Sequence, residues 1–237
     1  MKRIKRFYDT VSIAPVAEGR FGLLLNGKRV RTPLGEQLVF PNEGTAVAVA
    51  TEWQLQKDFI VPNTMPMSTI LMTYIDIDSK AVREDKLAQI GRFLQTDTLR
   101  FPDLNKESEL WKLQAERWSP IIAYMNSRGA SLTQSTTGFG LPAEANAEVQ
   151  VVKETILTSY DMMKLTMLET AAKYLKSGSI GIGLIEGAVT PTQAFEAAYV
   201  EELSQRTNWG LVEGDHDVND AETLLWLNGI SILAKLD

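Results

Sequence analysis

The chain has 237 residues, of which 24 are basic and 30 acidic, so its formal net charge of −6 argues against a protein that binds nucleic acid by neutralising phosphates. At this length, with 44% hydrophobic residues and no run near the roughly 20 apolar residues of a membrane span, we expect one large or two small domains and no membrane insertion. The absence of cysteine and the single histidine, His216, exclude disulfides, thiolate zinc sites and zinc sites with two imidazoles.

The first 42 residues have the pattern of a small β-sheet and a basic charge. Residues 1–35 alone carry a net charge of +6. Short strand-like runs are separated by Gly, Pro and Asn, and we expect strands only over about residues 6–42. Asn26-Gly27 predicts a type I′ turn, because both central residues of that turn need positive φ. Phe21–Leu25 and Lys28–Arg31 should therefore pair as a hairpin.

From about Glu43 the hydrophobic period becomes helical. Ala46, Ala50, Trp53 and Phe59 are expected on one side of a helix that Pro62 closes. Glu52 on this helix is interpreted as a cap or ion-pair residue, and Trp53 as core.

Nearly everything beyond residue 80 reads as helix. An apolar stripe is expected from Trp111 to Met125, and Pro120 predicts a kink or a break near Ser119. A loop should follow over Arg128–Pro142. Three further helices are predicted at about 143–176, broken near Tyr160, then at 191–207 and 217–236.

The fold class is therefore α+β. A small β-rich N-terminal domain with one or two helices is expected over residues 1–80, and a larger α-helical domain over residues 81–237. The last segment, 177–237, carries a net charge of −8, so the two regions should present different surfaces.

Three motifs resemble known ligand-binding sites, but each lacks a residue that the site requires. Gly22 to Lys28 has phosphate-loop spacing, but Arg29 stands where a hydroxyl residue must hold magnesium, so we expect no nucleotide binding. Gly181 and Gly183 resemble a dinucleotide fingerprint, and we interpret them as glycines of close helix packing. The segment from Asp215 to Asp220 resembles a calcium loop without its glycine. Asp217 or Asn219 is better explained as the N-cap of the last helix.

Short motifs occur in order over about residues 6–230. The main ones are Arg6-Phe7-Tyr8, Asn26-Gly27-Lys28, Glu52-Trp53-Gln54, Met65-Pro66-Met67, Thr96-Asp97-Thr98, Trp118-Ser119-Pro120, Ser177-Gly178-Ser179, Glu201-Glu202, Trp209-Gly210 and Glu213 to His216-Asp217. With these motifs the chain resembles the ATP synthase F1 complex assembly factor 2 family, the mitochondrial assembly chaperones of the ATP synthase α subunit.

The resemblance implies a non-enzymatic chaperone that holds the free α subunit and masks the surface destined for the β subunit. It implies no cofactor and no metal, a chain that is monomeric when free, and residence in the mitochondrial matrix with the presequence absent from this chain. The bacterial cytoplasm is the alternative location.

Candidate partner-binding residues gather in an acidic loop ahead of the last helix. Glu213 is the first of them, since no helix stripe requires it. The negative field of its acidic neighbours suits basic groups on a client. The further candidates are Trp209, Asp215, Asp217, Glu202, Met65 and Met67.

Two questions stay open from sequence alone. Met65 and Met67 are either an adaptable contact surface or core, and Trp209 either contacts the partner or fixes its loop from a buried position. The alternative function is an enzyme of unknown chemistry that uses a carboxylate pair near His216.

Overall fold

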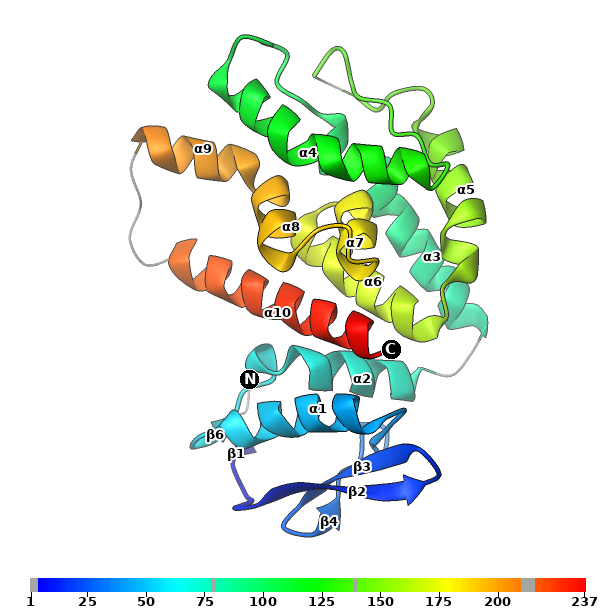
Figure 1. Ribbon diagram of the computed structural model, residues 1–237, viewed down its shortest axis with the longest axis vertical. Coiled ribbons are helices and arrows are strands. Elements are labelled where there is room, and N and C mark those ends of the chain that lie inside the picture. Colours follow the sequence, from blue (N-terminus) through cyan, green and yellow to red (C-terminus); the bar gives the residue numbers. More distant parts are fainter. Residues whose placement is uncertain (1–3, 78–79, 139, 210–215) are drawn as a thin grey trace. The chain divides into compact units, whose positions relative to one another are not determined.

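The computed structural model describes residues 4–77, 80–138, 140–209 and 216–237, with the side chains of all of these except 80–81, 207–209 and 216–217. It divides into two compact units, one formed by residues 1–79 with 232–237 and the other by residues 80–231. Strands occur only in the first 60 described residues and helices follow, which confirms the α+β class (Figure 1). None of the helices in the described part of the chain could cross a membrane.

A four-stranded antiparallel sheet forms the base of the first unit. Its central strand β3 pairs with each of the other three; the strands are β2 (Val11–Ala17), β3 (Arg20–Leu25), β4 (Lys28–Arg29) and β5 (Val39–Phe40). Leu25 pairs with Lys28, and φ is +48° at Asn26 and +74° at Gly27, which confirms the predicted hairpin. This segment is not the strand, loop and helix that a phosphate loop requires.

A second, two-stranded sheet lies outside the range predicted for strands. β1 (Ile4–Lys5) pairs with β6 (Phe59–Ile60), so the prediction of strands only at residues 6–42 is wrong at both ends. Runs of two residues carry too little periodicity to be recognised, and the pairing joins segments more than 50 residues apart.

Helix α1 (Glu43–Leu55) begins at Asn42, whose Oδ1 accepts a hydrogen bond from Thr45 N at 2.8 Å. It ends four residues before Phe59, so the prediction that the helix includes Phe59 is wrong. Gln56 causes the stop: its backbone is extended, and its side-chain Oε1 accepts from Val61 N at 2.8 Å. A short 3-10 turn, η1 (Pro62–Thr64), then leads into α2 (Pro66–Asp76).

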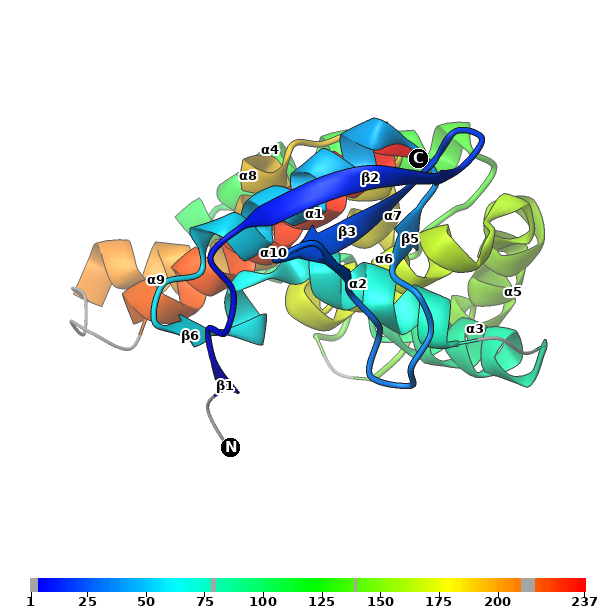
Figure 2. The same cartoon turned by 90° about the horizontal axis from the view of Figure 1, so that it is seen from below.

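Helix α1 packs against β2 and β3 to make the core of the first unit (Figure 2). Leu23, Leu38, Phe40, Ala46 and Val49 are each no more than 1% exposed there. The end of the chain joins this unit, since Asn42 Nδ2 donates to the backbone oxygen of Leu236 at 2.8 Å.

The second unit is helical. Its elements are α3 (Lys80–Gln95), η2 (Thr98–Arg100), α4 (Glu109–Ser127), α5 (Ala145–Thr155), η3 (Leu157–Ser159), α6 (Met162–Leu175), α7 (Gly178–Ile185), α8 (Pro191–Ala198), α9 (Val200–Trp209) and α10 (His216–Leu236), whose residues from 232 onward belong to the first unit. α6 and α7 lie at its centre, where Leu165, Leu168, Ile180 and Ile182 are fully buried. The predicted break near Tyr160 and the loop after α4 are confirmed for the described residues.

The structure settles the continuity of two predicted helices. α4 continues through Pro120, so of the two predicted alternatives, a kink or a break near Ser119, the break does not occur; buried Trp118 and Ile121 anchor the helix on both sides of the proline. The helix predicted at 191–207 is two helices, since Tyr199 leaves helical geometry, stacks on Phe195 and donates to Tyr174 O at 2.7 Å.

Helix α7 was not predicted, and its glycines make its packing possible. A Cβ at Gly178 would lie 2.6 Å from Leu94 Cγ, and one at Gly181 would lie 2.9 Å from Leu168 Cδ1. This agrees with the interpretation of Gly181 as a helix-packing glycine and not as part of a dinucleotide site.

Candidate partner-binding site

The second unit contains a cavity of about 350 Å³ that combines apolar surface with two carboxylates. We call it the acidic cavity; its lining residues are Phe93, Thr96, Thr98, Phe101, Lys176, Ala198, Tyr199, Glu201 and Glu202. The aromatic residues are half-buried, whereas Glu201 and Glu202 are exposed. The cavity can thus receive an apolar side chain and a neighbouring positive charge together.

Asp97 stabilises the turn that carries Thr96 and Thr98, two lining residues of the acidic cavity. Its carboxylate is 0% exposed and accepts from Leu99 N at 3.1 Å, Ser177 Oγ at 2.6 Å and Ser179 N at 2.9 Å. Burial raises the pKa of Asp97, and these hydrogen bonds oppose the rise. The motifs Thr96-Asp97-Thr98 and Ser177-Gly178-Ser179 therefore form one structural unit.

Lys176 is fixed at the cavity by a left-handed backbone conformation. Its φ is +53° at the end of α6, and its carbonyl accepts from Thr98 Oγ1 at 3.1 Å. A non-glycine residue in this region is uncommon. The hydrogen bond from Thr98 ties the end of α6 to the turn before η2, so the lysine is held at a defined place in the lining.

The first turn of α9 presents the two carboxylates. Gln114 Nε2, from buried Gln114 on α4, donates to Glu201 Oε1 at 3.1 Å and so orients that side chain. Burial raises the pKa of Glu201, and the negative charges of Asp103 and Glu202 raise it further. Such a carboxylate is more strongly attracted to an arriving cation than an isolated one.

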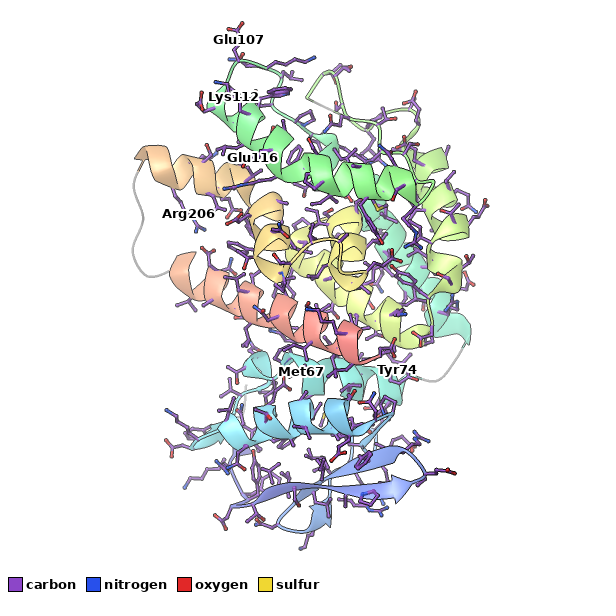
Figure 3. The ribbon with its side chains drawn as sticks, viewed as in Figure 1. Met67, Tyr74, Glu107, Lys112, Glu116 and Arg206 are labelled. Carbon is purple, nitrogen blue, oxygen red and sulfur yellow. The ribbon has the colours of Figure 1, made fainter. Side chains whose placement is uncertain are left out.

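Arg206 links α9 to α10 on either side of residues 210–215. It forms a two-pronged ion pair with Asp220 through Nη1 and Nη2, and its Nη2 lies 3.6 Å from Glu202 Oε2. Figure 3 shows the arginine pointing from α9 toward α10. This bidentate pairing fixes the helix ends that border the predicted acidic loop.

Of the residues predicted in and near the acidic loop, the structure describes the side chain of Glu202 but not those of the others. Glu202 lines the acidic cavity. Glu213 and Asp215 lie outside the described residues. Trp209 is the last residue of α9, where a loop had been predicted, and Asp217 is the second residue of α10; the side chains of both lie outside those described.

The last helix begins earlier than its predicted N-caps. Because α10 starts at His216, both Asp217 and Asn219 lie inside the helix, and the N-cap prediction is wrong. The side chain of His216 is outside the described set, so the structure does not place the carboxylate pair near it that an enzyme would use.

Met65 and Met67 are 2% and 8% exposed, which agrees with the core-filling alternative (Met67 is labelled in Figure 3). Both precede or begin α2, where Glu52 caps the helix: its carboxylate accepts from Met67 N at 2.8 Å and from Ser68 N and Oγ at 2.7 Å. The interpretation of Glu52 as a cap is confirmed, as is that of Trp53 as core at 8% exposure.

Sequence reasoning did not single out the aromatic part of the cavity. Phe93, Phe101 and Tyr199 lie on three elements, and nothing in their spacing shows that they meet. The one available signal was the pair of motifs around Asp97 and Ser177. Among the described residues, no group of three or more His, Asp or Glu side chains could hold a metal ion. The apolar lining beside two carboxylates suits the docking of a side chain.

Known proteins resemble this chain over nearly its whole length. The sequence model of the family described as "ATP12 chaperone protein" matches residues 5–126, more than half of the chain. "Protein atp12, mitochondrial" of Schizosaccharomyces pombe is 24% identical and the alignment covers 98% of this chain and 82% of that protein. "Protein ATP12, mitochondrial" of Saccharomyces cerevisiae is 26% identical, with 92% and 80% covered.

Two solved structures share the fold. The Atu1473 protein of Agrobacterium tumefaciens superposes with a TM-score of 0.81 at 29% identity, covering 98% of this chain and 85% of that one. Atp12 from Paracoccus denitrificans superposes with a TM-score of 0.77 at 24% identity, covering 98% of both chains.

Proposed function

The chain belongs to the ATP12 chaperone family, and we propose that it assists assembly of the ATP synthase catalytic head by binding the free α subunit. The acidic cavity is the candidate site for this binding, because it places aromatic surface next to Glu201 and Glu202. A subunit that waits for its partner exposes an interface of apolar and charged groups, and such surfaces aggregate when left open. The cavity offers a complementary surface for a segment of that kind.

The client segment should combine an apolar side chain with a basic one. The apolar group would bury against Phe93, Phe101 and Tyr199, and the basic group would meet the two carboxylates. A charge pair that is desolvated on binding contributes far more than one at the rim. We extend this surface to Glu213, Asp215 and Asp217, which follow Glu202 in the sequence and add negative charge.

We further propose that the covered surface of α is the one destined for β, and that the chaperone acts in the mitochondrial matrix. The yeast relatives are named mitochondrial, which supports this compartment. The similar structures come from bacteria, so a bacterial cytoplasm is the alternative. Masking requires no catalysis.

Aggregation of isolated α subunit tests the proposal. The parent chain at equimolar ratio should suppress the light scattering of α on warming, because it covers the exposed interface. Glu201→Lys with Glu202→Lys, and separately Glu213→Lys, should lose this protection, since each replaces attraction for a basic client group with repulsion. Protection is compared at a temperature where every variant is folded, as shown by its melting curve, because Glu201→Lys removes the acceptor of Gln114 Nε2 and Glu202→Lys removes a carboxylate 3.6 Å from Arg206 Nη2.

Glu107→Lys with Glu116→Lys is the matched control. Glu107 just before α4 and Glu116 on α4 are exposed, and neither lines the acidic cavity (both are labelled in Figure 3). The control should protect α like the parent. Full protection by the Glu201 and Glu202 double variant would remove the acidic cavity from the client site, and failure of the parent to bind α would end the proposal itself.

A further inference from the structure

A cavity of about 450 Å³ lies in the first unit, and its charged lining residues are basic, whereas those of the acidic cavity include two carboxylates. It lies beside the Asn26-Gly27 turn, and we call it the basic groove; the lining residues that matter here are Phe7, Tyr8, Lys28, Arg29, Arg31 and Trp53. None of its lining residues is acidic. All of them come from residues 7–53, so the groove belongs to one compact unit.

The three cations of the groove are available for a partner. Lys28, Arg29 and Arg31 are exposed. Arg29 Nη1 donates to Gln37 Oε1 at 3.1 Å and Arg31 Nη1 to Gly35 O at 2.6 Å, both neutral acceptors. Within the described residues no carboxylate forms an ion pair with any of the three. Their positive charge is thus uncompensated at short range.

Aromatic side chains make up the other half of the groove. Phe7 is 67% exposed, and its ring stands edge-on to that of Tyr8 with centroids 5.5 Å apart. Trp53 is buried, and within the described residues its indole Nε1–H has no acceptor. A buried indole N–H usually has a partner. The groove therefore combines an uncovered phenyl ring with three cations.

We propose that the basic groove binds an acidic segment of a partner polypeptide. An apolar side chain of that segment packs on Phe7, and its carboxylates meet Lys28, Arg29 and Arg31. A phosphate group or lipid headgroup would leave the aromatic half of the groove unused, whereas an acidic peptide segment with an apolar side chain uses both halves. This contact goes beyond the proposed function, because an acidic segment could not bind at Glu201 and Glu202.

Fluorescence anisotropy of the whole chain tests the proposal. The probe is a fluorescein-labelled peptide with a central phenylalanine flanked by two aspartates on each side, compared with the same peptide carrying lysines. The acidic peptide should bind, more weakly as salt rises, and the lysine peptide should not. Lys28→Glu with Arg29→Glu, and separately Phe7→Ser, should weaken binding about tenfold or more.

Arg20→Glu with Lys57→Glu is the matched control, since it makes the same charge change at exposed positions of this unit outside the groove. It should change the affinity less than about twofold. The proposal is overturned if the parent does not bind the acidic peptide, or if the control weakens binding as much as the groove variant. It is also overturned if phosphatidylserine vesicles or a short oligonucleotide bind through Lys28 and Arg29 while the peptide does not compete.

Discussion

At the residue scale, buried carboxylates organise this protein. Asp97, Glu52, Glu148 and Glu169 are each less than 9% exposed, and each accepts several hydrogen bonds. A buried carboxylate is costly unless it is satisfied, so its donors fix the backbone around it. The donors to Asp97 and Glu52 are backbone N–H groups at helix starts together with a serine hydroxyl each. Asp97 thus caps its own η2 and also the start of α7, and Glu52 caps the start of α2 from another helix.

Asp97→Ala should destabilise the second unit severely. The change leaves Leu99 N, Ser179 N and Ser177 Oγ without their acceptor in a fully buried place. Each unsatisfied buried donor costs about 1–3 kcal/mol, so we expect a loss on the order of 3 kcal/mol or more in the free energy of unfolding. Urea unfolding measures it, with Asp85→Ala at an exposed position on α3 as control. A loss below about 0.5 kcal/mol would show that water replaces the carboxylate without cost.

At the element scale, ion pairs between distant helices join the second unit. Glu148 on α5 accepts from Arg100 Nη1 at 2.6 Å and from Thr133 Oγ1 at 2.6 Å. Glu169 on α6 pairs with Lys86 of α3 and with Lys173. Burial alone would raise the pKa of both glutamates, but hydrogen bonds from Thr133 and Arg100, and from Lys173 and Lys86, outweigh burial and lower it.

The lowered pKa of Glu148 predicts a pH dependence. The folded chain holds the proton on this carboxylate less tightly than the unfolded chain does, so the stabilisation is complete above the ordinary glutamate pKa of about 4.3 and is lost as the pH falls below it. Glu148→Gln should therefore be less stable than the parent at pH 7, and the difference should shrink between about pH 4 and pH 3.

Urea midpoints at several pH values measure this difference. Glu84→Gln, at an exposed position on α3, is the control and should track the parent at every pH. A gap between Glu148→Gln and the parent that stays constant down to pH 3 would mean that the carboxylate charge does not contribute.

Local signals in the sequence predict part of this fold. Asn26-Gly27 needs only its own φ values to define the hairpin, and the break near Tyr160 is visible in the local pattern. α7 was missed, although Gly181 and Gly183 had been interpreted as packing glycines, because glycine has a low helix propensity; the close contacts with Leu94 and Leu168 require Gly178 and Gly181. Contacts such as Lys86 to Glu169, 83 residues apart, leave no local signature.

The candidate site also has one part that the local sequence predicts and one part that only long-range contacts create. The acids of the C-terminal segment are visible in the sequence, and Glu202 does line a cavity. The aromatic residues Phe93, Phe101 and Tyr199 come from separate elements, and only the fold brings them together. The sequence leaves both a contact surface and core filling open for Met65 and Met67, with core filling favoured, and their burial beside the cap that Glu52 forms agrees with core filling.

At the scale of the whole molecule, two compact units carry opposite local charge. The basic groove belongs to the first unit and the acidic cavity to the second. A client that binds at both sites must carry an acidic segment for the basic groove and a basic segment for the acidic cavity. This requirement selects partners more strictly than a single apolar patch would. Surfaces of this kind suit a chaperone that recognises one subunit and not unfolded chains in general.

Competition between the chaperone and the β subunit tests the central claim most directly. Isolated α subunit, this chain and β subunit are mixed at equal concentration and separated by size-exclusion chromatography. If the chaperone covers the surface of α that β uses, α should elute with the chaperone before β is added and with β afterwards, with the chaperone released. Recovery of a stable complex of all three, in which α and β pair normally, would contradict the account.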